Sequence, residues 1–172
     1  MIFKDKYRNP AFFLIGYSGV GKTTLAEMLR DSLVDSGHKV FLFDGDDMSQ
    51  SKVLSKFNGR DIDSRLKRAY QLTHLINWIR KQEIIPIVSV IGQPKKAREH
   101  WRHNIDGYAE IYLECNLDEC IRRDNKNVYK GSSNVIGVDI EFEKPQNPEI
   151  TLDAESNSPT MLLKILTNLL EA

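Results

Sequence analysis

The sequence has little cysteine and no excess of charge of either sign. Its 2 cysteines, Cys115 and Cys120, are too few for a disulfide framework and lack the C-x-x-C spacing of a zinc site. We therefore expect two reduced thiols in a cytoplasmic protein. The 24 Lys and Arg residues balance the 24 Asp and Glu residues. Proteins that bind nucleic-acid polymers normally carry a basic excess, so this balance argues against such a partner and leaves room for a local basic pocket that binds a small anion.

The sequence also lacks a long hydrophobic run. Its densest apolar stretch, residues 84–91, is far shorter than the ~20 residues that a membrane span needs. A short apolar run near the N-terminus ends at Gly16, without the small-residue cleavage site of a signal peptide. These absences predict no membrane partner and a cytoplasmic location. The length of 172 residues predicts one domain, residues 1–172.

Short apolar runs alternate with longer amphipathic ones along the chain. The predicted strands cover residues 12–15, 40–43, 84–91, 109–114 and 150–152. The predicted helices cover residues 22–36, 61–82, 95–103, 117–123 and 159–170. Pro86 suggests that the third strand begins irregularly. Strands that alternate with helices predict βαβ units and a parallel sheet, whose ligands bind beyond the carboxyl ends of the strands.

Residues 16–23 follow the first predicted strand and fit G-x-x-x-x-G-K-[ST], the phosphate-binding P-loop. Its glycines let the backbone turn several N–H groups toward one anion, and the next helix points its positive end at the phosphates. Lys22 can reach the β- and γ-phosphates, and the Thr23 hydroxyl can bind Mg²⁺. The alternative is a glycine-rich turn with an unrelated lysine. The residues predicted to bind ATP are Ser18, Gly19, Val20, Gly21, Lys22, Thr23 and Thr24.

The P-loop and the order of elements together predict an α/β fold of the P-loop NTPase type. This fold is a three-layer α/β/α sandwich with a five-stranded parallel sheet. The motif alone does not identify the reaction. A GTPase carries a guanine-reading N-K-x-D motif, which residues 125–128 imitate, but Val128 stands where the Asp is required. This mismatch disfavours a GTPase. The small size of the chain favours a small-molecule kinase.

Two carboxylates, Asp44 and Asp46, flank Gly45 at the end of the second predicted strand. In a parallel sheet this predicted turn opens on the same edge as the P-loop. A carboxylate there can bind Mg²⁺ through water, or accept a proton from an attacking hydroxyl. The alternative is an ordinary polar turn, since Asp and Gly are common turn residues.

Four segments extend these motifs over nearly the whole chain. They are residues 16–24 with Phe43-Asp-Gly-Asp-Asp47, residues 122–130, residues 136–145, and Asn147-Pro-Glu-Ile150 through Asp153. Together they resemble the adenylylsulfate kinase family. That family transfers the γ-phosphate of ATP to the 3′-hydroxyl of adenosine 5′-phosphosulfate (APS). The resemblance implies a kinase that uses ATP and Mg²⁺, takes a small nucleotide acceptor and forms a homodimer, although no interface can be identified from the sequence.

The resemblance also implies roles for particular residues. Asp46 lies beside the acceptor hydroxyl, Asp44 helps to hold Mg²⁺, and Phe57 stacks on the substrate base. Arg123 and Lys126 fall in a mobile lid of about residues 122–138. A basic lid that closes over phosphates can stabilise the charge that develops during transfer and exclude water, whereas the alternative is a solvated helix end. The predicted catalytic residues are Asp46, Lys22 and Arg123.

The chain departs from the family pattern where the family binds its acceptor. Ser49 and Ile62 stand in place of two arginines, Arg65 in place of an asparagine, and Val135 near a base-stacking aromatic. Arg65 can compensate in part because it lies one helical turn from Ile62. A bidentate arginine recognises sulfate or phosphate in a way that Ser or Ile cannot. The residues predicted to bind the acceptor are Asp46, Phe57, Arg65, Ile91, Arg98 and Lys126.

These observations predict an ATP-dependent kinase that phosphorylates the ribose 3′-hydroxyl of a 5′-modified nucleotide. Two alternatives are an authentic adenylylsulfate kinase and a catalytically silent nucleotide-binding module. The retained Lys22, Thr23, Asp44 and Asp46 argue against the silent module, which does not need all four.

Overall fold

The computed structural model describes residues 9–50 and 59–171, with the side chains of residues 48–50 and 171 excepted. The strands are β1 (Ala11–Ile15), β2 (Val40–Asp44), β3 (Ile85–Val90), β4 (Tyr108–Glu114) and β5 (Ile150–Asp153). The helices are α2 (Lys22–Asp35), α3 (Gly45–Gln50), α4 (Ile62–Arg80), α5 (Lys95–Asn104), α6 (Leu117–Arg122), α7 (Val128–Gly131) and α8 (Pro159–Glu171). Within these residues, no helix combines the length and apolar character needed to cross a membrane.

The five strands form one parallel sheet in the order β2-β3-β1-β4-β5. Strand β1 is central, and Leu14 lies opposite Ser89 of β3 on one side and Ile111 of β4 on the other. The predicted five-stranded parallel sheet is therefore confirmed. Because all five strands run parallel, their carboxyl ends lie at one edge of the sheet.

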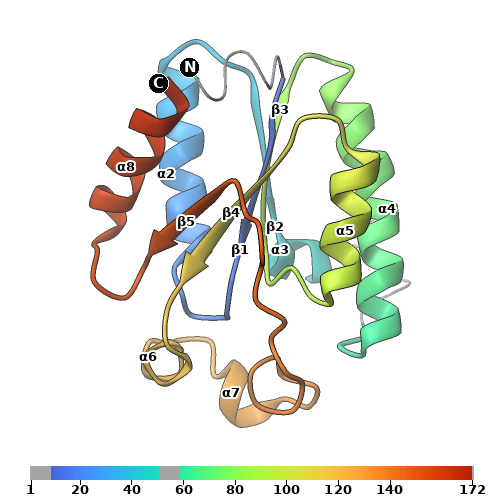
Figure 1. Ribbon diagram of the computed structural model, residues 1–172. Coiled ribbons are helices and arrows are strands. Elements are labelled where there is room, and N and C mark those ends of the chain that lie inside the picture. Colours follow the sequence, from blue (N-terminus) through green and yellow to red (C-terminus); the bar gives the residue numbers. More distant parts are fainter. Residues whose placement is uncertain (1–8, 51–58, 172) are drawn as a thin grey trace.

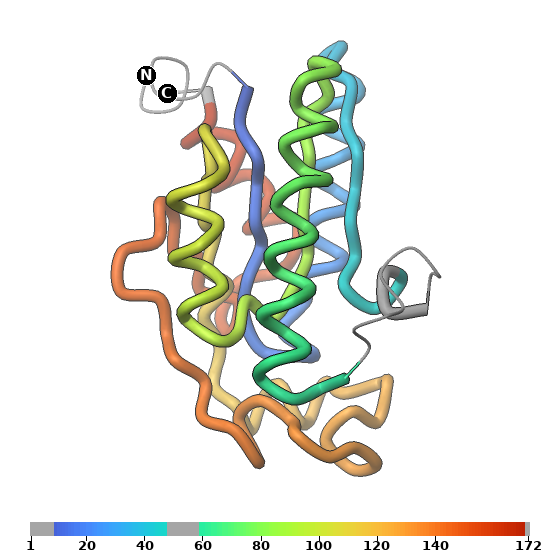
Figure 2. The backbone as a smooth tube through the Cα atoms, turned by 90° about the vertical axis from the view of Figure 1, so that its right-hand side faces the viewer, coloured from blue at the N-terminus to red at the C-terminus, as the bar shows by residue number. Residues whose placement is uncertain are grey.

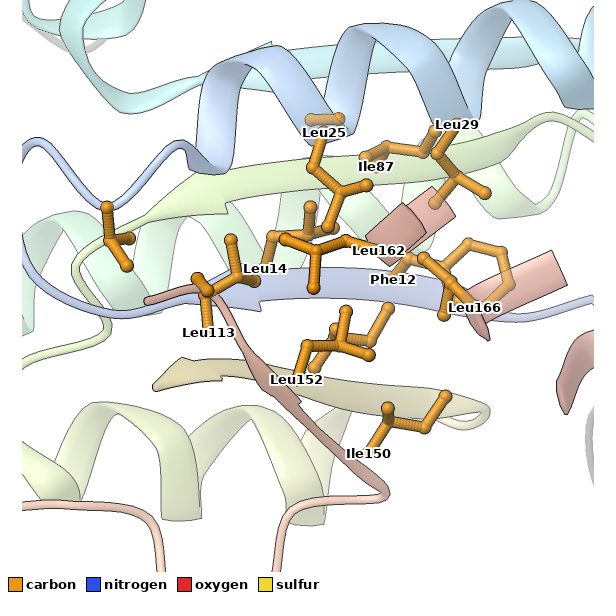
Figure 3. Packing of buried hydrophobic residues seen from close by; sticks show 14 of the residues in the cluster. Phe12, Leu14, Leu25, Leu29, Ile87, Leu113, Ile150, Leu152, Leu162 and Leu166 are labelled. Carbon is orange, nitrogen blue, oxygen red and sulfur yellow. The ribbon is translucent and has the colours of Figure 1, made fainter. Parts of the chain in front are cut away.

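The sheet is covered by helices on both faces, as Figure 1 shows: α2 and α8 on one side, α4 and α5 on the other. Side chains alternate along β1, so Phe12 and Leu14 pack toward α2 and α8 (Figure 3). Phe13 and Ile15 pack instead into a second cluster with residues of α4 and α5. Both clusters are buried, and each fully buried large side chain contributes about 1.5–3 kcal/mol. This arrangement is the predicted three-layer sandwich.

Two local predictions are corrected. The Asp44-Gly45-Asp46 segment is not an open turn, because the short helix α3 begins at Gly45 and carries Asp46 in its first turn. Strand β3 begins regularly at Ile85 despite Pro86. The Ile85 N–H donates to Lys39 O on the β2 side, so the missing N–H of Pro86 faces β1, whose pairing with β3 starts only at Ile87.

The carboxyl ends of the strands point to the edge of the sheet where α6 and α7 lie (Figure 1). The segment after α7 crosses below this edge and then runs up beside the sheet, as the orange tube in Figure 2 shows. One continuous stretch between β4 and β5, residues 117–149, therefore lies along the carboxyl edge of the sheet.

Candidate active site

The phosphate loop between β1 and α2 has the backbone that its glycines predict. Gly19 has a φ of 78°, and a Cβ atom there would lie 2.5 Å from the carbonyl oxygen of Cys120. Gly21 has a φ of 98° and is the N-cap residue of α2, with no side chain capping the helix. No acidic residue lies in the first turn of α2. The first turn of α2 is therefore suited to an anionic ligand.

Lys22 folds back over this loop. Its Nζ donates a hydrogen bond to the Tyr17 carbonyl oxygen at 2.6 Å, and the residue is only 9% exposed. Burial lowers the pKa of Lys22 to about 8, although Asp44 and Asp46 act in the opposite direction. An anion bound at the loop would favour the charged form of this amine.

Thr23 and Asp44 bring two oxygen atoms together at the start of α2 and the end of β2. The Thr23 hydroxyl donates to Asp44 Oδ2 at 2.6 Å, and the Asp46 N–H donates to Asp44 Oδ1 at 2.9 Å. Burial acts to raise the pKa of Asp44, but hydrogen bonds from Thr23, the Asp46 N–H and Ser89 together hold that pKa below its ordinary value. The carboxylate is therefore kept ionised.

This oxygen pair fits Mg²⁺, which prefers hard oxygen ligands. Across the described ranges, no cluster of three or more His, Cys, Asp or Glu side chains could hold a metal on its own. Magnesium is commonly bound by one or two protein oxygens together with substrate phosphates and water. Thr23 and Asp44 supply that number.

Asp46 forms an ion pair with Lys126. The Lys126 Nζ lies 2.5 Å from Asp46 Oδ2, and both side chains are more than half exposed. The hydrogen bond to Asp46 raises the pKa of Lys126. The two residues are 80 positions apart in the sequence. The fold thus brings the predicted base and a cation of the predicted lid into contact at the mouth of the site.

Two other residues after α6 hold this segment against its surroundings. Arg123 donates to Glu119 Oε1 at 2.6 Å and to the Ala154 carbonyl oxygen at 2.8 Å. The Tyr129 hydroxyl donates to the Ser18 carbonyl oxygen at 2.9 Å. Through Tyr129, this segment is attached directly to the phosphate loop.

One pocket of about 690 Å³ joins the phosphate loop to residues of α4, β3 and the segment before β5. Most of the predicted site residues line it: Ser18, Gly19, Gly21, Lys22, Thr23, Thr24, Asp44, Asp46, Arg65, Ile91, Arg123 and Lys126. Val135 also lines the pocket and is 4% exposed. Val20 is buried in the core below the loop instead. Phe57 lies outside the described residues.

Arg98, which the sequence predicts to bind the acceptor, is not among the residues that line this pocket. It is 4% exposed, and its guanidinium donates to the carbonyl oxygens of Gly92 at 2.6 Å and Glu143 at 2.7 Å. Its Nε also lies 3.8 Å from the carboxylate of Glu110, which is buried as well. Arg98 therefore fixes the loop after β3 against the segment before β5.

Among the pocket residues that the sequence-based prediction missed are Arg60, Arg68 and Gln93. Arg68 lies three residues after Arg65 on α4, and this helical spacing was a usable signal. Gln93 is nearly buried and donates to the Glu143 carbonyl oxygen at 2.9 Å. No sequence pattern marks Gln93, because its place depends on a residue 50 positions away.

Comparison with known proteins places the chain among kinases. The family model described as adenylylsulphate kinase matches residues 8–153. A probable adenylyl-sulfate kinase of Aeropyrum pernix is 31% identical over 169 residues, which cover 93% of this chain and 91% of the relative. A cytidine diphosphoramidate kinase of Campylobacter jejuni is 32% identical over 139 residues, which cover 78% of this chain and 80% of the relative.

A solved structure of similar fold is the APS kinase of Mycobacterium tuberculosis in complex with AMPPNP and APS. It matches with a TM-score of 0.85 at 22% identity, and the match covers 95% of this chain and 98% of that chain. At this identity the likeness concerns the fold, which is that of the P-loop kinases.

Proposed function

The chain belongs to the adenylylsulphate kinase family and is a phosphotransferase with a hydroxyl acceptor; from that premise we propose that it phosphorylates the ribose 3′-hydroxyl of a 5′-modified nucleotide other than APS. The observation that carries this proposal is the pocket of about 690 Å³ that joins an intact phosphate loop to a changed acceptor wall.

The donor side supports ATP as the phosphate source. Lys22 and the uncapped start of α2 can take up the charge of the β- and γ-phosphates. Thr23 and Asp44 would hold Mg²⁺, which neutralises phosphate charge when it is bound. These residues position the phosphates without covalent chemistry, as phosphoryl transfer requires.

Asp46 is assigned to the acceptor hydroxyl. Its exposed carboxylate can orient that hydroxyl or accept its proton once Lys126 is displaced. Lys126 and Arg123 line the same pocket and can stabilise negative charge on the transferred group. We also propose that residues 122–138 act as a lid, because the contact between Tyr129 and Ser18 joins this segment to the phosphate loop.

The acceptor wall supports a nucleotide other than APS. Arg65 lines it where the family pattern has an asparagine, and Val135 lines it near the position of the family's second aromatic. The Campylobacter relative, named for a cytidine diphosphoramidate acceptor, has an identity of 32%, close to the 31% of the Aeropyrum relative, over a shorter stretch of 139 residues. An acceptor with a 5′-diphosphate and a different terminal group or base is compatible with both observations.

The second candidate is authentic adenylylsulfate kinase activity. It is favoured by the names of relatives that cover most of the chain, such as the enzyme of Aeropyrum pernix. In this case the sequence departures at Ser49, Ile62 and Val135 would be tolerated, and the protein would still accept APS.

The test is release of ADP from Mg·ATP with a panel of acceptors. The panel contains APS, several nucleoside 5′-diphosphates, and their amidate and sugar derivatives. Turnover with another nucleotide but not with APS supports the proposal, whereas turnover with APS alone supports the second candidate. If no acceptor of the panel caused release of ADP, the proposal and the second candidate would both be contradicted. The homodimer and the cytoplasmic location stay predictions, and sedimentation velocity would test the first.

A further inference from the structure

Gln93 lies in the loop that joins β3 to α5, at the carboxyl edge of the sheet (Figure 1). It lines the pocket, although the whole residue is only 5% exposed. Its Nε2 donates a hydrogen bond to the Glu143 carbonyl oxygen at 2.9 Å. One end of the side-chain amide is therefore fixed by the segment before β5.

The partner of this hydrogen bond is itself held in place. Arg98 donates to the same Glu143 carbonyl oxygen at 2.7 Å and to the Gly92 carbonyl oxygen at 2.6 Å. The backbone N–H of Lys95 donates to the Glu143 carboxylate at 2.7 Å. Glu143 is thus tied to residues on both sides of Gln93. The Gln93 amide is positioned before any ligand arrives, so little conformational freedom is lost on binding.

The orientation of the Gln93 amide follows from its partner. If the amide were turned over, its Oε1 would face the Glu143 carbonyl oxygen, and two acceptors would meet at 2.9 Å. Oε1 therefore points away from Glu143, and it has no hydrogen-bond partner among the described residues. The one fully buried side-chain polar atom that lacks a partner in this part of the chain is the Tyr112 hydroxyl. Oε1 is therefore accessible, and we place it toward the pocket that Gln93 lines.

The pocket wall beside this loop is apolar. Its lining residues come from α4, α5, the loop after β3 and the segment before β5, and they are Ala69, Leu72, Ile91, Trp101, Val135 and Ile136. Four of them belong to one hydrophobic cluster, against which Ile91 packs. The indole N–H of Trp101 already donates to the Ala69 carbonyl oxygen at 3.0 Å. An oriented acceptor beside apolar surface suits a flat ring that carries a hydrogen-bond donor on one edge.

The bases of nucleotides differ at such an edge. Cytosine and adenine carry an exocyclic amino group, N4 or N6, whereas uracil and hypoxanthine carry a carbonyl oxygen at the same position. An amino group can donate to Oε1 of Gln93. A carbonyl oxygen would meet Oε1 acceptor to acceptor and leave both without a donor, which is the situation that a polar site rejects most strongly.

We propose that Gln93 determines base specificity: its Oε1 accepts a hydrogen bond from the exocyclic amino group of the acceptor nucleotide, and so selects cytosine or adenine over uracil or hypoxanthine. This inference rests on the proposed function, because it assumes that the acceptor in this pocket is a nucleotide. The apolar wall contributes contact area, which both kinds of base supply equally.

The test uses two pairs of ligands that differ in this one group. The donor site is saturated with Mg·AMPPNP, and the protein is then titrated calorimetrically with CDP and UDP and with ADP and inosine 5′-diphosphate. We expect at least one amino-bearing nucleotide to bind about tenfold more tightly than its carbonyl counterpart, because the carbonyl base leaves Oε1 unpaired. The pair that shows the preference identifies the base.

Gln93→Met keeps the length of the side chain and removes the acceptor. It should bring the affinity ratio of that pair close to one, mainly by weakening the amino-bearing nucleotide. A merely structural role would weaken both members of the pair equally and leave the ratio as it is in the wild-type protein. Gln71→Met is the matched control, because Gln71 is exposed on α4 and does not line the pocket. It should keep the wild-type ratio.

Two outcomes would overturn the inference. One is a wild-type protein that prefers the amino-bearing nucleotide in neither pair, whether it binds the four ligands equally or binds none of them. The other is a preference that Gln93→Met leaves unchanged. The wild-type ratio requires no variant, so the inference stays testable even if Gln93→Met does not fold.

The same measurements separate this inference from the proposed function. A preference for an amino base that depends on Gln93, together with ADP release on APS alone, would leave the role of Gln93 standing and contradict the acceptor proposed above. Turnover of a non-APS nucleotide without any such preference would do the reverse.

Discussion

The two halves of the pocket are built in different ways. The donor half comes mainly from one continuous stretch, residues 16–24, to which β2 adds Asp44, and it acts mainly through backbone N–H groups and a helix start. The acceptor half is assembled from α4, the loop after β3 and the segment before β5, and acts through side chains. A backbone cradle tolerates little change because its glycines require a positive φ. A wall of separate side chains can change one residue at a time. This difference is consistent with a donor site that is retained and an acceptor site that has changed.

The largest effect should come from breaking the donor half. Lys22→Ala removes the side chain that can reach the transferred phosphate, so we expect kcat to fall about a thousandfold. Lys164→Ala, an exposed lysine of α8, is the control and should have wild-type turnover. ADP release measured with the best acceptor checks this. Near-normal turnover by Lys22→Ala would show that the loop is not the catalytic half.

The next effect should come from loosening the acceptor wall. Arg98→Met removes the buried one of the two arginines of α5 beside the Glu110 carboxylate and leaves Arg102, at 3.5 Å, as the other; such a loss costs about 3 kcal/mol of unfolding free energy. Because Arg98 also ties Gly92 to Glu143, the acceptor KM should rise while ATP affinity stays unchanged. Urea denaturation measures the unfolding free energy, and steady-state kinetics with the acceptor and with ATP as the varied substrate measure the two KM values. Lys96→Met, on the exposed face of α5, is the control. Equal losses of ATP and acceptor affinity would contradict the proposed division of the pocket into a donor half and an acceptor half.

A third variant tests the point where the halves meet. Asp46→Asn removes the proposed base and its charge, so kcat should fall about a hundredfold with little change in ATP affinity. Asp47→Asn is the matched control, since Asp47 is adjacent, exposed and absent from the pocket lining. Single-turnover kinetics compare the rate of phosphoryl transfer in the two variants. Equal rates for the two variants would remove Asp46 from the mechanism.

The smallest effect should come from the link between the lid and the loop. Tyr129→Phe deletes one hydrogen bond to the Ser18 carbonyl oxygen, worth about 1 kcal/mol. We expect ATP affinity to weaken a few-fold and the acceptor KM to stay constant. Calorimetric titration with AMPPNP provides the measurement. If only the acceptor KM changed, Tyr129 would belong to the acceptor half of the pocket.

The donor half and the order of elements could be predicted from the sequence because both depend on local patterns. The P-loop spacing and the alternating apolar runs are contained in single segments, and α3 was missed only because Asp-Gly-Asp also suits a turn. The acceptor half depends on tertiary contacts. Arg98 points to the carbonyl oxygen of a residue 45 positions away, and Gln93 reaches the same residue. Helical spacing alone cannot tell such a structural arginine from Arg65, which faces the pocket.

The central claim is that phosphoryl transfer is kept and the acceptor has changed. The most direct test is the ratio of kcat/KM for the best non-sulfated 5′-modified nucleotide to kcat/KM for APS, measured on the wild-type protein with saturating Mg·ATP. The account predicts a ratio well above one, because Arg65 and Val135 change the acceptor wall. A ratio below one, with APS as the preferred acceptor, would contradict it.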